Sequence, residues 1–286
     1  MKIAFIGYGD IATRTAARLA ALEPSWHCVG LCRTPTNKAP APNTTLVAGN
    51  SQNEQDLREL LYPTDAPIPD AVVITLTPAE YSAQGYHEGY VVPCRHLQHL
   101  LAQHPQPPLI IYISSTSVYG ERDGEWVTHT TPAQPTQATG KALLTAEQLL
   151  QSAHPQAKVH ILRCSGIYGP GRERLLQNIR SGKVTASAGW TNRIHVEDVA
   201  GFIVHLLQQP QPDTYIVSDD EPTPAATVYR FIAKLLSLDL QLAEQADTGA
   251  RGSKRLANDA MKATGYQLQY PSYQLGYSDL LRDPEA

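Results

Sequence analysis

Short apolar runs alternate along the chain with segments in which apolar residues recur at helical spacing. Because the strands of a parallel sheet are covered on both faces, such runs predict buried strands. The runs lie at 2–6, 27–32, 44–48, 71–76, 109–113, 159–162 and 214–217. The helical patterns lie at 11–22, 54–61, 92–101, 139–151 and 196–207. This alternation predicts an α/β fold with a doubly wound parallel sheet.

The first apolar run leads directly into a glycine turn. Gly7, Gly9 and Ala12 have the spacing G-x-G-x-x-A between a predicted strand and a predicted helix. The first glycine permits the tight turn, the second lets a pyrophosphate approach the backbone, and the alanine lets helix and strand pack closely. In this context the pattern predicts a dinucleotide site, and a tight turn without a ligand is the alternative. The expected site residues are Gly7, Tyr8, Gly9, Asp10, Ile11 and Ala12.

The second predicted strand ends in basic rather than acidic residues. An acidic residue at this point binds the ribose 2′-hydroxyl of NAD, but none occurs within 24–53. Arg33 and Thr34 follow the strand, and Lys38 is nearby. These cations favour the 2′-phosphate of NADP, with NAD less favoured, unless Arg33 is only a solvated loop charge. The end of the fourth strand adds Thr75, Leu76 and Thr77 to the expected cofactor site.

A second part of the chain is expected to bind the substrate. Residues 164–194 and 218–286 are richer in turns than the alternating part. Ligands of open α/β sheets bind at the carboxyl ends of the strands, which such segments can cover. We therefore expect an NAD(P)-binding domain at 1–163 and 195–217, with a smaller, discontinuous substrate-binding lobe at 164–194 and 218–286.

Composition and charge exclude several classes of partner. Charged residues make up 17% of the chain and the net charge is −4, which gives no electrostatic case for nucleic acid or an anionic membrane. No apolar run approaches the roughly 18 residues that span a bilayer, and no signal peptide is recognisable. The four cysteines lie in apolar settings typical of reduced thiols, so we expect a cytoplasmic protein. Histidines of the helix at 92–101 lack partners at ligand spacing, so no metal is expected.

Three further motifs carry a resemblance to a known family. They are Ser-Ser-Thr-Ser-Val-Tyr-Gly at 114–120, Leu-Arg-Cys-Ser-Gly-Ile-Tyr-Gly-Pro-Gly at 162–171, and Arg-Ile-His-Val-Glu-Asp-Val-Ala at 193–200. Together with the glycine turn they resemble the extended short-chain dehydrogenase/reductases, which include nucleotide-sugar epimerases and dehydratases. The resemblance runs over nearly the whole chain. It implies a Rossmann domain, a bound NAD(P), and a homodimer formed through the helices at 92–101 and 139–151.

The chain departs from this family at its catalytic pair. The family uses Tyr-x-x-x-Lys, in which the tyrosine exchanges a proton with the substrate and the lysine lowers its pKa. If Lys141 is that lysine, Gln137 stands in the tyrosine's place. An alignment on Glu147 instead puts Thr139 in the place of the tyrosine and Leu143 in the place of the lysine. Neither alignment supplies a tyrosine, and glutamine cannot act as a general acid near neutral pH. The chain therefore resembles atypical members of the family.

The resemblance assigns roles to residues of both expected parts. Ser115 matches the hydroxyl that orients the reacting oxygen, and Thr116-Ser117 replaces the Asp-Glu of dehydratases, so dehydration is not expected. The candidate catalytic residues are Ser115, Tyr119 and Lys141. Tyr168 is expected beside the cofactor and is a second candidate proton donor. Thr116, Arg193 and His195 are expected to bind the substrate, although His195 is equally consistent with a packed core histidine.

Two functions follow from this reading. The first is an NADP-dependent oxidoreductase or epimerase acting on a small polar substrate, with nucleotide sugars among the candidates. The alternative is a catalytically degenerate sensor or scaffold that binds NAD(P) without turnover. Loss of the tyrosine favours the alternative, whereas the retained Ser115, Arg193 and second lobe favour the enzyme.

Overall fold

The computed structural model describes every residue except 105, 188, 209–212, 243, 246–251 and 283–286. Two compact units make up the chain. The first contains Met1–Val118, Pro135–Arg163 and Ala200–Thr214, and the second contains Tyr119–Gln134, Cys164–Val199 and Tyr215–Ala286. Each unit has a hydrophobic core of its own.

A seven-stranded sheet in the order β12-β7-β5-β4-β1-β2-β3 contains the strands of the first unit, and its edge strand β12 belongs to the second unit from Tyr215 onwards. Its strands are β1 (Lys2–Ile6), β2 (His27–Cys32), β3 (Thr44–Ala48), β4 (Ala71–Ile74), β5 (Leu109–Ser115), β7 (Val159–Cys164) and β12 (Thr214–Val217). The neighbours from β3 to β5 pair in parallel. The sheet grows from β1 first towards β3 and then, from β4 onwards, in the opposite direction. This reversal is the topological switch point at which such sheets bind ligands.

The predicted strands are confirmed, with small changes at their ends. β4 stops at Ile74, whereas β5 continues to Ser115 and β7 to Cys164. The strands inside the sheet are apolar and buried almost throughout, as in Ala71–Ile74, where all four residues are buried. The edge strand β3 is only partly buried, because it has a neighbour on one side alone.

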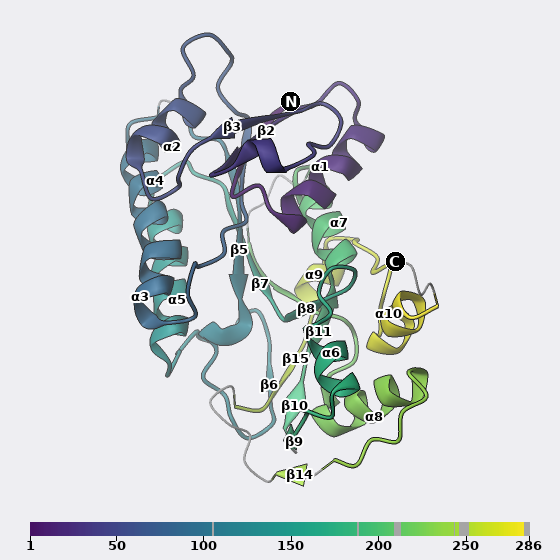
Figure 1. Cartoon of the computed structure of the whole chain (residues 1–286). Coiled ribbons are helices and arrows are strands. Elements are labelled where there is room, and N and C mark those ends of the chain that lie inside the picture. The colour runs from purple at the N-terminus through teal and green to yellow at the C-terminus, as the bar shows by residue number, and fades with distance from the viewer. Residues whose placement is uncertain (105, 188, 209–212, 243, 246–251, 283–286) are drawn as a thin grey trace. The chain divides into compact units, whose positions relative to one another are not determined.

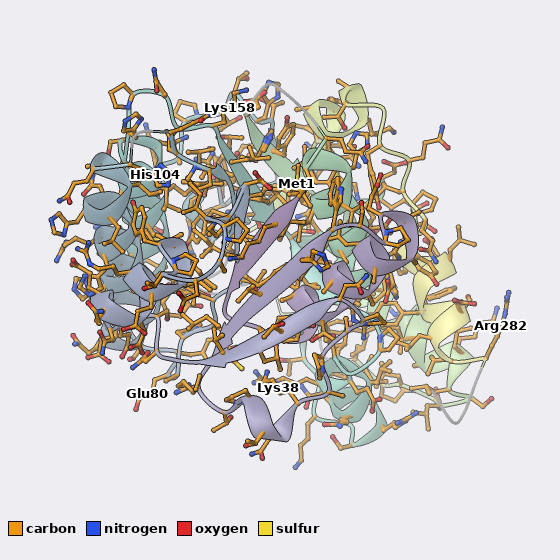
Figure 2. All side chains as sticks on the ribbon, turned by 90° about the horizontal axis from the view of Figure 1, so that it is seen from above. Met1, Lys38, Glu80, His104, Lys158 and Arg282 are labelled. Atoms are coloured by element: carbon orange, nitrogen blue, oxygen red, sulfur yellow. The ribbon has the colours of Figure 1, made fainter. Side chains whose placement is uncertain are left out.

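Helices cover both faces of this sheet (Figure 1). Those of the first unit are α1 (Asp10–Leu22), η1 (Pro35–Asn37), α2 (Glu54–Leu61), α3 (Ala83–Tyr86), η2 (His87–Val91), α4 (Val92–Ala102), η3 (Thr116–Val118), α5 (Ala138–Gln151) and α7 (Val196–Leu206), of which residues 200–206 belong to it. Helices α2, α3, α4 and α5 lie on one face and α1 on the other. Leu57, Leu97 and Leu150 contribute to the core between that helical layer and the sheet. The view from above in Figure 2 shows side chains filling these layers, with Met1 before β1 and Lys38 just after η1.

The helix predicted at 92–101 is longer in the structure than its sequence pattern indicates. Its amino-terminal extension consists of α3 and the π-helical turn η2, which continue without a break into α4. Two glycines weaken the helical pattern of this extension. A Cβ on Gly85 would lie 2.3 Å from the carbonyl oxygen of Glu80, so the glycine is required by a close approach of the backbone.

The second unit is built from short strands and helices. Its strands are β6 (Glu125–Val127), β8 (Gly166–Tyr168), β9 (Ala186–Ser187), β10 (Trp190–Thr191), β11 (Arg193–His195), β13 (Thr223–Pro224), β14 (Glu244–Gln245) and β15 (Lys254–Leu256). Its helices are α6 (Arg174–Arg180), α8 (Ala225–Leu235), α9 (Asp259–Ala263) and α10 (Tyr273–Leu280). Residues 119–134 were predicted to belong to the first domain. In the structure they fall in the second unit, where β6 pairs with β15. The assignment of substrate binding to this unit stays a prediction.

Candidate cofactor site

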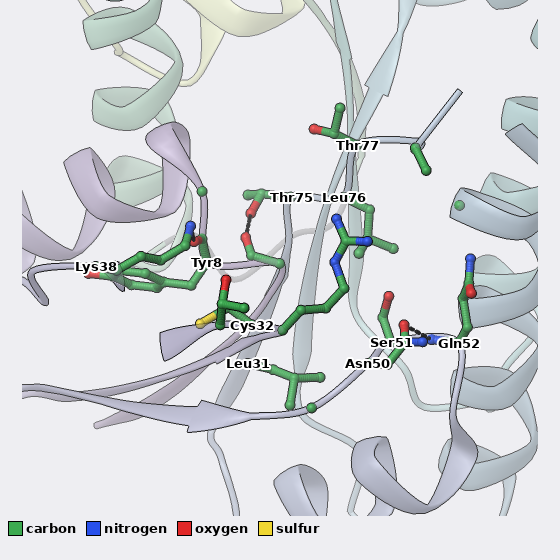
Figure 3. A pocket seen from close by; sticks show the side chains of 17 residues that line it. Tyr8, Leu31, Cys32, Lys38, Asn50, Ser51, Gln52, Thr75, Leu76 and Thr77 are labelled. Carbon is green, nitrogen blue, oxygen red and sulfur yellow. Dashed lines mark hydrogen bonds between the residues drawn. The ribbon is translucent and has the colours of Figure 1, made fainter. Parts of the chain in front are cut away.

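A cavity of about 430 Å³ lies at the carboxyl edge of the sheet, at the switch point between β1 and β4 (Figure 3). Segments that follow β1, β2, β3 and β4 all contribute to its wall. The residues expected at the cofactor that line it are Gly7, Tyr8, Gly9, Arg33, Thr34, Lys38, Thr75, Leu76 and Thr77. The structure therefore brings together segments that lie far apart in the sequence.

The glycine turn has the geometry that its sequence predicts. Gly7 has a φ of 89°, and a Cβ there would lie 3.0 Å from the carbonyl oxygen of Thr75. The Thr75 hydroxyl donates to the carbonyl oxygen of Gly7 at 2.5 Å and so fixes the turn to β4. Gly9 caps helix α1, and a Cβ there would meet nothing within 4 Å. The open space at Gly9, in front of the helix N–H groups, fits a pyrophosphate.

Three residues of the predicted glycine motif do not line the cavity. Ala12 is fully buried, which agrees with its expected role in packing helix against strand. Ile11 is partly buried within helix α1. Asp10 accepts a hydrogen bond from the Arg14 side chain at 2.6 Å, and this ion pair offsets an acidic charge close to a phosphate site.

The charged side chains that line the cavity are Arg33 and Lys38, and no acidic residue is among the lining residues that the structure describes. Both cations are exposed, so they are accessible to a ligand. Opposite charge and charge-assisted hydrogen bonds make such a wall suited to a phosphate group. The electrostatics of the cavity fit a phosphorylated ribose.

The cavity wall also includes residues outside the expected set, which come from the segment after β3 and from helix η2; of these, the family resemblance places only Asn50 beside the adenine. Asn50, Ser51 and Gln52 follow β3, and Gly89 belongs to η2. The side-chain amide of Gln52 donates to the carbonyl oxygen of Glu88 at 3.1 Å and so ties these two segments together. For Ser51 and Gln52, the signal in the sequence was their place at the carboxyl end of the third predicted strand. The position of Gly89 depends on the unpredicted extension of α4.

Ser115, Thr116 and Lys141 lie near one another in the first unit. Ser115 ends β5 and Thr116 begins η3, which contacts α5. A Cβ on Gly140 would lie 2.5 Å from the carbonyl oxygen of Ser117, so the first turn of α5 packs closely on this segment. The Ser115 hydroxyl accepts a hydrogen bond from the N–H of Ser117 at 3.2 Å. Lys141 is exposed in that first turn.

A buried ion pair fixes the carboxyl end of β5. Glu147 of α5 accepts hydrogen bonds from Arg163 of β7, the shortest of them from Nη2 at 2.7 Å. The hydroxyl of Ser114 donates to the same carboxylate at 2.5 Å. Because Ser114 immediately precedes Ser115, the pair holds the backbone from which the Ser115 hydroxyl projects.

The remaining candidates, Tyr119, Tyr168, Arg193 and His195, belong to the second unit. The rings of Tyr168 and His195 lie 5.1 Å apart, edge to face, and His195 accepts a hydrogen bond from the N–H of Glu197. Arg193 is buried, and its guanidinium donates to the Thr191 hydroxyl at 2.8 Å. Tyr119 donates to the carbonyl oxygen of Thr128 at 3.4 Å. Their catalytic, cofactor and substrate roles stay predictions.

Two of these groups have shifted acid–base properties. Burial raises the pKa of Tyr168 well above its ordinary value, and the negative charge of Asp219 adds to the shift. A phenol of this kind holds its proton throughout the physiological range. Asp219 follows β12 and is almost fully buried, and this burial raises its pKa to about 8 although the charge of Arg193 opposes the shift.

The described ranges contain neither a metal-binding cluster nor a membrane-spanning helix. Those residues contain no group of three or more His, Cys, Asp or Glu side chains able to hold a metal ion. His96 and His99 both contact Glu54, at 3.1 and 3.0 Å. No described helix is long and apolar enough to cross a membrane.

The strand order, the glycine turn and the cavity at the switch point define a Rossmann-type protein, with its cavity at the place where such folds bind ligands. The chain belongs to the NAD dependent epimerase/dehydratase family, whose family model matches residues 7–218. This confirms the predicted family and fold.

Individual relatives agree with this assignment. The chain is 38% identical over 210 residues to Protein YeeZ of Escherichia coli (strain K12), covering 71% of this chain and 72% of that protein. A structure of a putative NAD-dependent epimerase/dehydratase from Methylobacillus flagellatus has 31% identity and a TM-score of 0.80, covering 98% of this chain and 97% of that one. Human epimerase family protein SDR39U1, determined with NADPH, has the same fold, with 15% identity, a TM-score of 0.78, and coverage of 99% and 100%.

Proposed function

We propose that this protein is an NADP-dependent oxidoreductase or epimerase acting on a small polar substrate, with nucleotide sugars among the candidates. The observation that carries the proposal is the wall of the cavity, which presents Arg33 and Lys38 and no acidic residue among those described. An acidic residue at the end of β2 would bind the 2′-hydroxyl of NAD and repel the phosphate of NADP. Structures of the same fold contain NADPH in SDR39U1 and NAD in the dTDP-glucose 4,6-dehydratase of Bacillus anthracis, so the fold accepts either cofactor and the choice rests on the cavity wall.

The chain's residues have distinct tasks in this proposal. The turn at Gly7–Gly9 and the first N–H groups of α1 hold the pyrophosphate, while Arg33 and Lys38 hold the 2′-phosphate. When bound, the nicotinamide supplies hydride transfer chemistry. Ser115 hydrogen-bonds the reacting oxygen of the substrate. Its hydroxyl lacks an adjacent base in the sequence, so it orients and polarises that oxygen while a tyrosine or an ordered water carries the proton.

The cofactor choice is tested by calorimetric titration with NADP⁺ and NAD⁺. Charge-assisted contacts to a phosphate contribute about 1–3 kcal/mol, so NADP⁺ should bind roughly five- to 150-fold more tightly. Arg33→Ala should remove a large part of this ratio. Arg58→Ala is the matched control, because Arg58 lies on α2 outside the cavity wall and pairs with Glu54. Equal affinities in the unmodified protein, or an unchanged ratio in Arg33→Ala, would refute the charge argument.

A specific observation favours the second candidate, a sensor or scaffold that binds NAD(P) without turnover. Helix α5 begins at Ala138 with Gln137 as its N-cap, so the position four residues before Lys141 carries an amide in place of a phenol. Turnover of NADPH with a panel of ketones, aldehydes and sugar nucleotides separates the two functions. Binding without turnover of any of them would favour the sensor.

The role of Ser115 is tested once a substrate is found. Ser115→Ala should lower turnover by roughly 10²–10⁴-fold, the range for loss of a positioning or proton-transfer group, with little change in NADP⁺ affinity. Ser117→Ala is the control, since its exposed hydroxyl lies two residues away on the same segment. Tyr119→Phe should lower turnover severely only if the Tyr119 phenol carries the proton. Unchanged rates in both Ser115→Ala and Tyr119→Phe would place the chemistry elsewhere.

Two broader expectations accompany this proposal. We expect a homodimer formed through α4 and α5, and light scattering that returned the 31.3 kDa mass of one chain would contradict it. We also expect a cytoplasmic location, because the thiols of all four cysteines are free. Fractionation of the source cells tests this second expectation.

A further inference from the structure

Tyr8, the second residue of the glycine turn, lines the cavity, yet its side chain is almost fully buried in the protein. Its residue exposure is 1%, and its ring packs edge to face on Phe5 at 6.0 Å. A Cβ on Gly30 of β2 would lie only 2.4 Å from a ring carbon of Tyr8. The ring therefore lies directly over the β2 backbone at Gly30, in space that only a glycine leaves free.

Two groups of the segment that follows β2 are bound to this one residue. The N–H of Ala41 donates to the phenol oxygen of Tyr8 at 3.2 Å. The ammonium group of Lys38 donates to the backbone carbonyl oxygen of Tyr8, and the two residues lie side by side in Figure 3. Tyr8 therefore contacts the segment at two points, one through its side chain and one through its backbone.

The Lys38 ammonium keeps binding capacity in this arrangement. It has three N–H donors, and the carbonyl of Tyr8 occupies one of them. Lys38 lines the cavity together with Arg33, so its other donors are available to a ligand there. The segment around it, with the short helix η1 as its only described regular element, has little internal structure to hold its shape. Its position depends on external contacts of the kind that Tyr8 supplies.

We propose that Tyr8 is a positioning residue for cofactor specificity: its buried phenol fixes the 33–41 segment so that Lys38 and Arg33 meet the 2′-phosphate of NADP. This rests on the proposed NADP preference. It assigns to the turn residue a role distinct from that of Gly7 and Gly9. The glycines serve the pyrophosphate that both cofactors share, whereas the phenol of Tyr8 serves the phosphate that only NADP carries.

The test is the affinity of Tyr8→Phe for NADP⁺ and NAD⁺, measured by calorimetry beside the unmodified protein. Phenylalanine keeps the ring over Gly30 and removes only the acceptor of the Ala41 N–H. Loss of one neutral hydrogen bond corresponds to about a two- to tenfold change in affinity. We expect NADP⁺ affinity to fall by that factor and NAD⁺ affinity to stay the same.

A double-mutant cycle with Lys38→Met shows whether Tyr8 acts through the lysine. In the Lys38→Met protein, the further change Tyr8→Phe should alter NADP⁺ affinity less than it does alone. Equal losses for both cofactors in Tyr8→Phe would mean that Tyr8 only stabilises the fold. No loss for either cofactor would mean that the 33–41 segment does not need the phenol of Tyr8. Either result overturns the proposal. The proposed NADP preference is judged separately, by the NADP⁺ to NAD⁺ ratio of the unmodified protein.

Discussion

The buried ion pair between Glu147 and Arg163 makes a quantitative prediction about stability. Three hydrogen bonds join the two groups, and their side chains are only 1% and 10% exposed. Removing one partner of such a pair leaves an uncompensated buried charge, which costs about 3–5 kcal/mol. Arg163→Leu should therefore lower the free energy of unfolding by that amount, which corresponds to a fall in Tm of roughly 6–20 °C.

The assay is urea and thermal unfolding followed by far-UV circular dichroism. Arg58→Leu is the matched control, because it removes the same charge from a pair with Glu54 whose side chains are 41% and 32% exposed. Exposed pairs contribute about 0–1 kcal/mol, so this variant should unfold nearly as the unmodified protein does.

The double variant Glu147→Leu/Arg163→Leu separates charge from packing. Replacing both charges by apolar groups removes the unpaired charge, so the double variant should be more stable than Arg163→Leu. The single variant Glu147→Leu completes the cycle. The reasoning is refuted if Arg163→Leu costs no more than Arg58→Leu, or if the cost of the double variant equals the sum of the costs of Glu147→Leu and Arg163→Leu.

Three further predictions concern glycines and a buried acid. Gly30→Ala should cost about 1–3 kcal/mol by overpacking, because its Cβ would overlap the Tyr8 ring, and thermal unfolding measures this. Gly9→Ala should leave Tm nearly unchanged, since its Cβ meets nothing within 4 Å. It should nevertheless weaken NADP⁺ binding, by roughly tenfold or more, because the methyl group fills the space in front of α1 where the pyrophosphate binds. A loss of Tm that accompanied the loss of binding would contradict this prediction. Asp219, with its pKa raised to about 8, keeps a proton in the folded state that the unfolded chain releases near pH 4. Its contribution to stability therefore falls as pH rises from about 4 to 8. Asp219→Asn should show its largest stability gain over the unmodified protein near pH 8 and none near pH 4, and a constant difference across this range would argue against the shift.

The local pattern of the sequence determined the elements of the first unit and their order along the chain. Continuous apolar runs predict buried parallel strands because both faces of such a strand exclude water, and β1, β2 and β3 have the predicted bounds. Gly7 and Gly9 likewise predict the turn, since its constraints are local backbone sterics and the approach of α1. The cations at the end of β2 were also readable from the sequence, because strand ends mark the ligand edge of the sheet.

Only the tertiary structure decided which distant segments meet at that edge and which way a turn residue points. Gln52 and Gly89 line the cavity because strand order and the unpredicted π-helical extension place β3 and η2 beside it, and neither is encoded in local periodicity. The place of Tyr8 in the motif predicts a residue at the cavity, and it does line the cavity, but the motif does not say where its ring lies. Its ring turns inward because Gly30, more than twenty residues away, leaves the space for it. The pairing of Glu147 with Arg163 is decided in the same way, since a buried charge requires a partner and the packing of α5 on the sheet determines which residue is within reach.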